Sequence, residues 1–195
     1  MSWFRRESYI ASGIPIQGSF DAGWVLDTHS SLQDGDWHRT VVGERLYRFK
    51  YRRSQASGRW LARTCVTFLE HLEPLWEVDL IAPVPSSRVS KKLSPAEYIS
   101  AKIAKAIGAS YPFRILYKTR PTRYIKEATT IEHRQRIIGN SMAVQQSDLI
   151  RGKRILLVDD LYETGATSDE AIRALREADP IWIGFLACTI VRGNG

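Results

Sequence analysis

The 195-residue sequence has only two cysteines, Cys65 and Cys188, and they stand far apart in the apolar stretches ARTCVTF and FLACTIV. Neither has another cysteine or a histidine nearby at the spacing of a metal site. Isolated cysteines in apolar surroundings are typical of a protein interior. The sequence therefore favours two buried free thiols over a disulfide or a zinc site.

Long apolar runs are also missing. No stretch approaches the roughly 20 residues that span a bilayer, and the opening segment MSWFRRESYI lacks the apolar core of a signal peptide. We therefore expect no membrane contact and a cytoplasmic location. The sequence also lacks internal repeats, low-complexity tracts and linkers, and its length fits one domain, with or without an appendage.

Acidic residues are outnumbered by basic ones, 21 against 28, which gives a formal net charge of +7. Such a charge attracts polyanions, either nucleic acid or a small phosphorylated substrate. The densest basic stretch, YRFKYRRSQASGR (47–59), has aromatic residues between its cations, which suits nucleic acid. The favoured alternative is an amphipathic helix with Leu46 and Phe49 turned inward and its lysines and arginines solvated.

Apolar strand patterns alternate with helical ones along the chain. The strands are predicted at 19–29, 77–85, 112–118, 154–160 and 181–191, and the helices at 43–51, 59–72, 94–108, 133–139 and 167–178. Ser94, with Glu97 three residues on, marks the start of one helix, and Gly108 marks its end. Residues 30–40 are expected to form a loop. Almost wholly apolar strands separated by helices predict an α/β doubly wound domain, with a mostly parallel sheet covered on both faces.

The most informative stretch is ILLVDDLYETGAT (155–167), where a buried strand runs into two adjacent carboxylates, Asp159 and Asp160. Two neighbouring acids repel each other, so we expect a ligand or water beside them. In such sheets, ligands bind beyond the carboxyl ends of the strands. The following Thr/Gly segment offers backbone N–H groups and hydroxyls for a phosphate, and the acids suit sugar hydroxyls. The alternative is a strand that ends in solvated acids, with Thr167 as a helix cap.

This stretch resembles the phosphoribosyl-pyrophosphate (PRPP) binding signature of type I phosphoribosyltransferases. Within that fold the chain is similar to the ComF-like family, named for a competence protein for DNA uptake. The supporting stretches are FDAGWVLDTH, RTVVGERLYRFKYR, IAPVPSSR and HRQRIIGNSMAV. The resemblance implies a type I phosphoribosyltransferase core over residues 76–195, preceded by a helical and irregular extension, residues 1–75. Within this extension, residues 1–40 would supply part of the acceptor pocket, or hood, and the helices would pack on the core.

The resemblance also implies a role for each matching position. Asp159 and Asp160 would hold the ribose hydroxyls, and residues 118–134 would form a mobile loop over the substrate. The cradle for the 5′-phosphate would consist of Glu163, Thr164, Gly165, Ala166 and Thr167. The pyrophosphate loop would consist of Val84, Pro85, Ser86, Ser87 and Arg88, with charge added by Lys91 and Lys92. Arg88 would stabilise the leaving group. Mg²⁺ would arrive with PRPP, so no residue is expected to be a metal ligand.

The chain departs from the family in three places. The four-cysteine zinc module of many relatives is absent, KKLSPAEY stands where relatives carry an RGFNQ-like stretch, and Glu163 stands where the phosphate loop often has threonine. Glu163 is either a general base for the acceptor or a helix acid favoured by the dipole. Arg134 and Arg136 are either solvated charges or substrate contacts.

We therefore expect an enzyme that binds Mg-PRPP and transfers the phosphoribosyl group to a nitrogen acceptor, such as a nucleobase, with release of pyrophosphate. Two alternatives remain open. The first is a non-catalytic protein that binds PRPP or a nucleotide as a signal, with or without nucleic acid bound at its basic surface. The second is an accessory protein of DNA uptake or processing that works through partners, which the family resemblance and the positive net charge favour. A homodimer is possible, since dimers are the commonest symmetric assembly.

Overall fold

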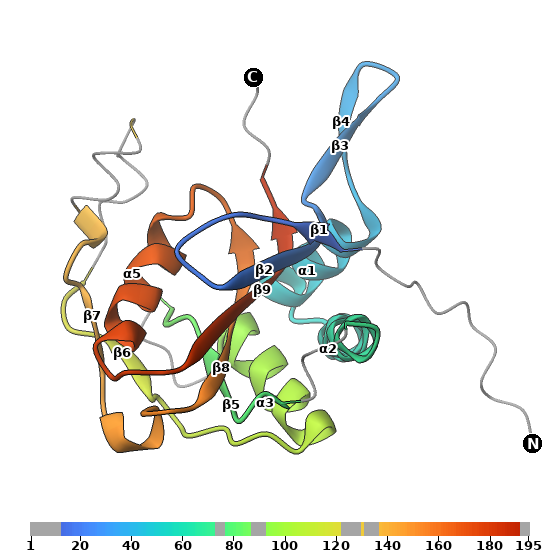
Figure 1. Cartoon of the computed structure of the whole chain (residues 1–195). Helices are drawn as coiled ribbons and strands as arrows, with labels where there is room; N and C mark the ends of the chain where they lie inside the picture. Colours follow the sequence, from blue (N-terminus) through green and yellow to red (C-terminus); the bar gives the residue numbers. More distant parts are fainter. Residues whose placement is uncertain (1–12, 73–76, 87–92, 122–129, 131–136, 192–195) are drawn as a thin grey trace, which may run out of the picture.

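The structure, a computed structural model, describes residues 13–72, 77–86, 93–121, 130 and 137–191 (Figure 1). The strands are β1 Ile14–Pro15, β2 Ala22–Thr28, β3 Ser30–Gln33, β4 Asp36–Arg39, β5 Leu80–Pro83, β6 Leu116–Lys118, β7 Met142–Val144, β8 Arg154–Tyr162 and β9 Trp182–Ile190. The helices are α1 Val41–Arg52, α2 Gln55–Glu70, α3 Pro95–Ile107 and α5 Ala166–Arg176, with a short 3-10 helix at Ser147–Leu149.

A five-stranded sheet in the order β1-β2-β9-β8-β5 forms the centre of the molecule. The strands β2, β9, β8 and β5 are parallel, and β1 is an antiparallel edge strand. Helix α5 lies on one face of the sheet with β6 and β7, while α1, α2 and α3 lie on the other (Figure 1). The predicted fold class, a doubly wound α/β domain with a mostly parallel sheet, is confirmed.

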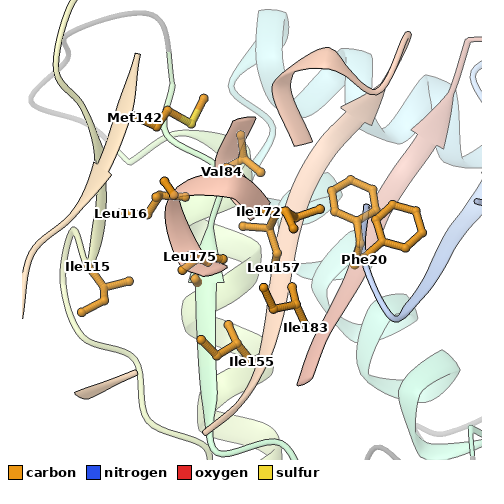
Figure 2. Close-up of a cluster of buried hydrophobic side chains, with 14 of the residues drawn as sticks. Phe20, Val84, Ile115, Leu116, Met142, Ile155, Leu157, Ile172, Leu175 and Ile183 are labelled. Carbon is orange, nitrogen blue, oxygen red and sulfur yellow. The ribbon is translucent and has the colours of Figure 1, made fainter. Parts of the chain in front are cut away.

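Side-chain alternation along β8 divides the interior into two cores. Ile155 and Leu157 pack toward α5 in one buried cluster, whereas Leu156 and Val158 pack toward α1, α2 and α3 in the other. Figure 2 shows the first cluster, in which Leu157 lies beside Ile172 of α5. Strands that are apolar on both faces are what a sheet covered by helices on both sides requires.

The helix boundaries agree with the cap residues. Helix α3 begins with a capping box in which the Ser94 side chain accepts from the Glu97 N–H, and it ends at Gly108 in the left-handed conformation. On α2, the apolar face predicted from the sequence is turned inward, and its residue Cys65 is a buried free thiol, as is Cys188. Although they are far apart in sequence, the two thiols lie next to each other between α2 and β9. A hydrogen bond with Cys65, together with burial, raises the pKa of Cys188.

One predicted strand lies outside the central sheet. Within the stretch 112–118, residues Leu116–Lys118 form β6, which pairs antiparallel with β7 in a separate two-stranded sheet. Buried Glu170 of α5 ties β7 to the domain, because its carboxylate accepts from the Met142 N–H at 2.9 Å and pairs with Arg173 at 2.8 Å. The apolar stretch does form a strand, as predicted. This strand pairs with β7 beside α5 and is not part of the central sheet.

The prediction of a loop at residues 30–40 was wrong. Ser30–Gln33 and Asp36–Arg39 form a β-hairpin that projects away from the body of the molecule (Figure 1). Its turn is Asp34-Gly35, and both residues have positive φ, 51° and 89°. Asp-Gly is a strong hairpin signal because both central residues of a type I′ turn need positive φ. The polar strands obscured this signal, since no apolar alternation accompanies them.

The division of the chain into residues 1–75 and 76–195 stays a prediction. Strand β2 and helices α1 and α2 lie before that boundary, yet β2 pairs with β9 in the central sheet. The predicted helix at 133–139 lies mostly outside the described residues. Across the described part of the chain, the helices are all too short or too polar to cross a membrane.

Replacing Leu157 with alanine is expected to lower the free energy of unfolding by about 2–5 kcal/mol, because the fully buried side chain leaves a cavity between β8 and α5. Urea unfolding measures the loss. The control is Leu149→Ala, because the Leu149 side chain is 46% exposed and its removal should cost no more than about 0.5 kcal/mol. Equal losses in the two variants would contradict the assigned core.

Candidate active site

The two acids lie at the open carboxyl edge of the sheet. Strand β5 ends at Pro83 opposite Val158, whereas β8 continues along β9 as far as Tyr162. The Val84 N–H donates to the Val158 carbonyl at 2.8 Å, which is the last hydrogen bond between β5 and β8 before the acids. Asp159 and Asp160 therefore stand one step beyond the end of β5, where a ligand has access.

Strand alternation points the two acids to opposite faces of the sheet. Asp159 continues the row of Ile155 and Leu157, and it lines a small cavity with the loop that follows β8. Asp160 continues the other row and reaches Lys50 of α1, with 2.8 Å between Nζ and Oδ1. Adjacent in sequence, the acids thus have different neighbours.

The Asp159 carboxyl turns back on its own strand. Its Oδ1 accepts from the Asp160 N–H at 2.7 Å. Burial, together with the negative charge of Asp160, raises the pKa of Asp159 to about 8, although this hydrogen bond and Lys50 oppose the shift. The raised pKa of Asp159 favours the protonated carboxyl, which can donate to a hydroxyl, while Asp160 is paired with the Lys50 ammonium.

Three cationic or titratable side chains from other elements surround the acids. Burial alone would lower the pKa of Lys50, but the charge and hydrogen bond of Asp160 outweigh it and raise this pKa. Burial lowers the pKa of Lys118 on β6, against the attraction of Asp159. Burial also lowers the pKa of His29, with help from Arg39 and Lys50, so the ring is neutral at neutral pH.

His29 links the acids to a second, larger hollow. Its Nδ1 lies 3.3 Å from the Thr189 Oγ1 at the end of β9, next to β8 in the sheet. The same side chain lines an open cavity of about 680 Å³ between the hairpin and the start of α1. The other lining residues are Ser30, Trp37, His38, Arg39 and Glu44.

The loop after β8 has the form of an anion site. Gly165 has φ of +81°, which glycine adopts without strain, and α5 begins at the next residue. Among the described residues, no side chain caps the first turn of α5, so its first N–H groups have no side-chain acceptor. The cavity is about 80 Å³ and is lined by Ile138, Asp159, Leu161, Tyr162, Glu163, Thr164, Gly165, Thr167 and Ser168.

Neighbouring polar groups keep this loop in shape. The Ser168 hydroxyl donates to the Gly165 carbonyl at 2.7 Å. Asp169, an acid in the first turn of α5, accepts from the Ser19 hydroxyl at 2.8 Å, which holds its carboxylate against the β1–β2 connection. Glu163 is exposed at the mouth of the cavity, and its assignment as a base or a helix acid stays a prediction.

The loop predicted to bind pyrophosphate is only partly described. Val84 is buried and uses its N–H in the ladder, Pro85 is half-buried, and Ser86 is exposed at the same edge as the acids. Four predicted contacts lie outside the described residues, namely Ser87, Arg88, Lys91 and Lys92. Arg134, Arg136 and most of the predicted mobile loop lie outside them as well.

Sequence reasoning missed Lys50, Lys118 and His29. The amphipathic helix was predicted with its cations solvated, and Lys50 is the exception, because it lies only partly exposed against Asp160. The spacing carried a signal: Lys50 is four residues from Leu46, which is 1% exposed, so both lie on the inward side of α1. A lysine at an inward helical position indicates an acidic partner.

The described residues contain no group of three or more His, Cys, Asp or Glu side chains that could hold a metal ion. The donors near the acids are a carboxyl that accepts from the backbone and a carboxylate paired with lysine. That set fits a metal ion which keeps substrate oxygens and water as its main ligands, as Mg²⁺ often does.

The pKa of Asp159 predicts an unusual pH dependence of stability. The native state holds a proton up to about pH 8 that the unfolded chain releases near pH 4. Native-state stability should therefore fall as the pH rises through this window, by at most about 1.4 kcal/mol per pH unit. Asp159→Asn keeps the hydrogen-bond acceptor and removes the titration. The stability of the variant relative to wild type should therefore rise between pH 4 and pH 8.

Thermal or urea unfolding at several pH values measures this gain. The matched control is Asp148→Asn, an exposed aspartate in the 3-10 helix, which should follow the wild-type pH profile. A constant difference between Asp159→Asn and wild type across the whole window would contradict a raised pKa.

Comparisons with known proteins agree with this geometry at the level of the family. Residues 95–194, just over half of the chain, match the family model described as "Phosphoribosyl transferase domain". A comparison with curated proteins finds no match.

Solved structures resemble the chain only distantly. "Glutamine phosphoribosylpyrophosphate (PRPP) amidotransferase from B. subtilis", complexed with ADP and GMP, is 21% identical, with 78% of this chain and 28% of that chain covered and a TM-score of 0.42. UMP synthase from Leishmania donovani is 20% identical, with 82% and 26% covered and a TM-score of 0.40. The "allosteric regulatory enzyme of purine biosynthesis" is 21% identical, with 67% and 25% covered and a TM-score of 0.43.

The chain spans about a quarter of the length of these three proteins. The family model is therefore the finding that carries the assignment, and it includes the end of β8, the acids and the loop into α5. The chain belongs to the phosphoribosyl transferase domain family.

Proposed function

We propose that this protein binds Mg-PRPP and transfers its phosphoribosyl group to a nitrogen acceptor, with release of pyrophosphate. One observation carries the proposal. Asp159 and the glycine-containing loop at the start of α5 line the same cavity. Donors for a phosphate and a carboxyl for sugar hydroxyls thus stand together, as a sugar phosphate requires.

In the proposed complex, the N–H groups after Gly165 and the hydroxyls of Thr164 and Thr167 hold the 5′-phosphate. Asp159 and Asp160 hold the ribose hydroxyls from the end of β8. Magnesium, carried by pyrophosphate and sugar oxygens, offsets the charge of the leaving group. Arg88 remains a predicted contact of the pyrophosphate.

During transfer, the bond from the anomeric carbon to pyrophosphate breaks and a bond to the acceptor nitrogen forms. Positive charge develops at the sugar, and the carboxylate of Asp160 stabilises it from the open edge of the sheet. The acceptor nitrogen gives up a proton to a nearby base. Glu163 at the cavity mouth and neutral His29 are the candidates, since both line hollows at this edge.

The cavity between the hairpin and α1 is the proposed acceptor site. Trp37 and His38 line it from the hairpin, and aromatic faces suit a planar nucleobase-like ring. His29 connects it to the acids through the end of β9. The acceptor would thereby approach the ribose from the side opposite the phosphate loop.

Membership of the ComF-like branch is part of the proposal. The family model begins at residue 95, so the support comes from stretches before it. FDAGWVLDTH falls on β2 and His29, and RTVVGERLYRFKYR falls on α1 with Lys50. Both stretches border the acids, as expected of segments that belong to the site.

Calorimetric titration of Mg-PRPP tests the proposal, with phosphorus NMR on the same samples to follow pyrophosphate release in the presence of candidate bases. Wild type should bind, and Gly165→Ala should bind at least tenfold more weakly. The added Cβ would lie 2.8 Å from the Tyr162 hydroxyl, so the Tyr162 side chain must shift beside the proposed phosphate loop, and the φ of +81° strains any residue that has a Cβ.

Gly152→Ala is the matched control. Gly152 also has positive φ, +68°, but a Cβ there meets no atom within 4 Å. It should show the same backbone penalty, about 1–2 kcal/mol, and leave PRPP binding intact. Binding without pyrophosphate release from any base would favour a PRPP sensor. Absence of binding in wild type would overturn the proposal.

A second candidate function, nucleic-acid binding, is favoured by the arginines of α1 and α2. Arg45, Arg48 and Arg52 recur on one side of α1, and Arg59 and Arg63 on one side of α2. The Arg45 guanidinium lies 5.4 Å from the Trp60 ring centre, which joins the two helices. Guanidinium groups suit phosphate oxygens.

For this second function, an Arg59→Ser/Arg63→Ser variant should lose most of its affinity for short DNA at low salt. Phosphate-driven binding is strongest there and weakens steeply as salt rises. Fluorescence anisotropy with labelled DNA, at two salt concentrations, measures it. Arg151→Ser, an exposed arginine before β8, serves as control. Absence of wild-type binding at low salt would dismiss the function.

A further inference from the structure

Lys50 and Asp160 form an ion pair across 110 positions of sequence, between α1 and β8. The two side chains are 27% and 14% exposed, so water screens the pair less than a surface pair. A fully solvated pair of this kind would contribute little to stability. This pair lies at the end of β8, where Asp160 is the chain neighbour of Asp159.

The start of α1 fixes where Lys50 points. The Thr40 hydroxyl donates to the Thr28 carbonyl at 2.6 Å and accepts from the Gly43 N–H at 3.1 Å, so the helix cap is attached to the end of β2. Gly43 lies so close to the same strand end that a Cβ there would be 2.1 Å from the His29 carbonyl oxygen. Lys50 follows about two turns later, on the buried side beside Leu46.

The charges around the pair come from every neighbouring element. Asp159 of β8 and His29 after β2 act on it directly, and Arg39 of β4 acts on His29. Tyr51 of α1 and the buried Cys188 thiol of β9 also interact with it. Lys118 of β6 faces Asp159 instead. Within the described residues, Lys50 is therefore the cation that directly balances Asp160.

The pair leaves part of Asp160 available. Lys50 bonds to Oδ1, and Oδ2 receives no hydrogen bond from the described residues. A carboxylate held by one oxygen presents the other in a fixed direction, which is the arrangement that favours a hydroxyl donor.

We propose that Lys50 is a positioning residue of the PRPP site: its ammonium fixes one oxygen of Asp160 and balances its charge, so that the ionised carboxylate presents its other oxygen to a ribose hydroxyl. The inference rests on the proposed function. It assigns to a helix outside the PRPP signature a part in the binding of the sugar.

A purely structural pair makes a different prediction. If Lys50 only attaches α1 to the sheet, its loss lowers thermal stability and weakens ligand binding equally at every pH. If it holds Asp160 ionised, its loss lets the acids keep a further proton at low pH, and the weakening of PRPP binding is greatest there.

The test titrates Mg-PRPP into wild type, Lys50→Met, Lys50→Arg and Lys105→Met at pH 6 and pH 9. Lys105 is an exposed lysine of α3 and supplies the matched control. We expect Lys50→Met to bind at least tenfold more weakly than wild type at pH 6, with a clearly smaller deficit at pH 9. Lys50→Arg, which retains the charge, should stay within about threefold of wild type, and Lys105→Met should match wild type.

A second readout needs no ligand. Carbon-13 NMR of the aspartate carboxyls should show Asp160 titrating at higher pH in Lys50→Met than in wild type. Equal deficits at both pH values, no deficit, or an unchanged carboxyl titration would each overturn the inference. If wild type itself fails to bind Mg-PRPP, the proposed function fails, and the carboxyl titration still decides whether Lys50 holds Asp160 ionised.

Discussion

The alternation of side chains along β8 governs both the core and the site. Ile155 and Leu157 pack on the face covered by α5, and Leu156 and Val158 pack on the face covered by α1, α2 and α3. The same alternation carries on past the end of β5 into the two acids. One strand thus sends a carboxyl to each side of the sheet, and each meets the elements that already cover that side.

Electrostatics then makes the two acids unlike. Asp160 pairs with Lys50, while burial and the negative charge of Asp160 raise the pKa of Asp159 to about 8. The repulsion expected of adjacent carboxylates is relieved by a cation on one side and a proton on the other.

The hairpin and α1 extend this edge into a larger surface. The hairpin follows β2 and α1 follows the hairpin, and the Thr40 cap and the close approach of Gly43 hold α1 against the end of β2. His29, at the junction, reaches Thr189 of the neighbouring strand. Segments that precede the matched family region therefore contribute side chains to the same edge of the sheet as the loop around Gly165.

Features that depend on neighbouring residues could be predicted from the amino-acid sequence. The apolar runs of β8 and β9, the Ser94 capping box and the loop around Gly165 depend on residues within a few positions of each other, so pattern and spacing were enough. Three long-range contacts appear only in the folded chain: Lys50 pairs with Asp160, Cys65 contacts Cys188, and β6 pairs with β7 outside the central sheet. These contacts join residues 24 to 123 positions apart, and they depend on how the helices and strands pack, which no short stretch of sequence encodes.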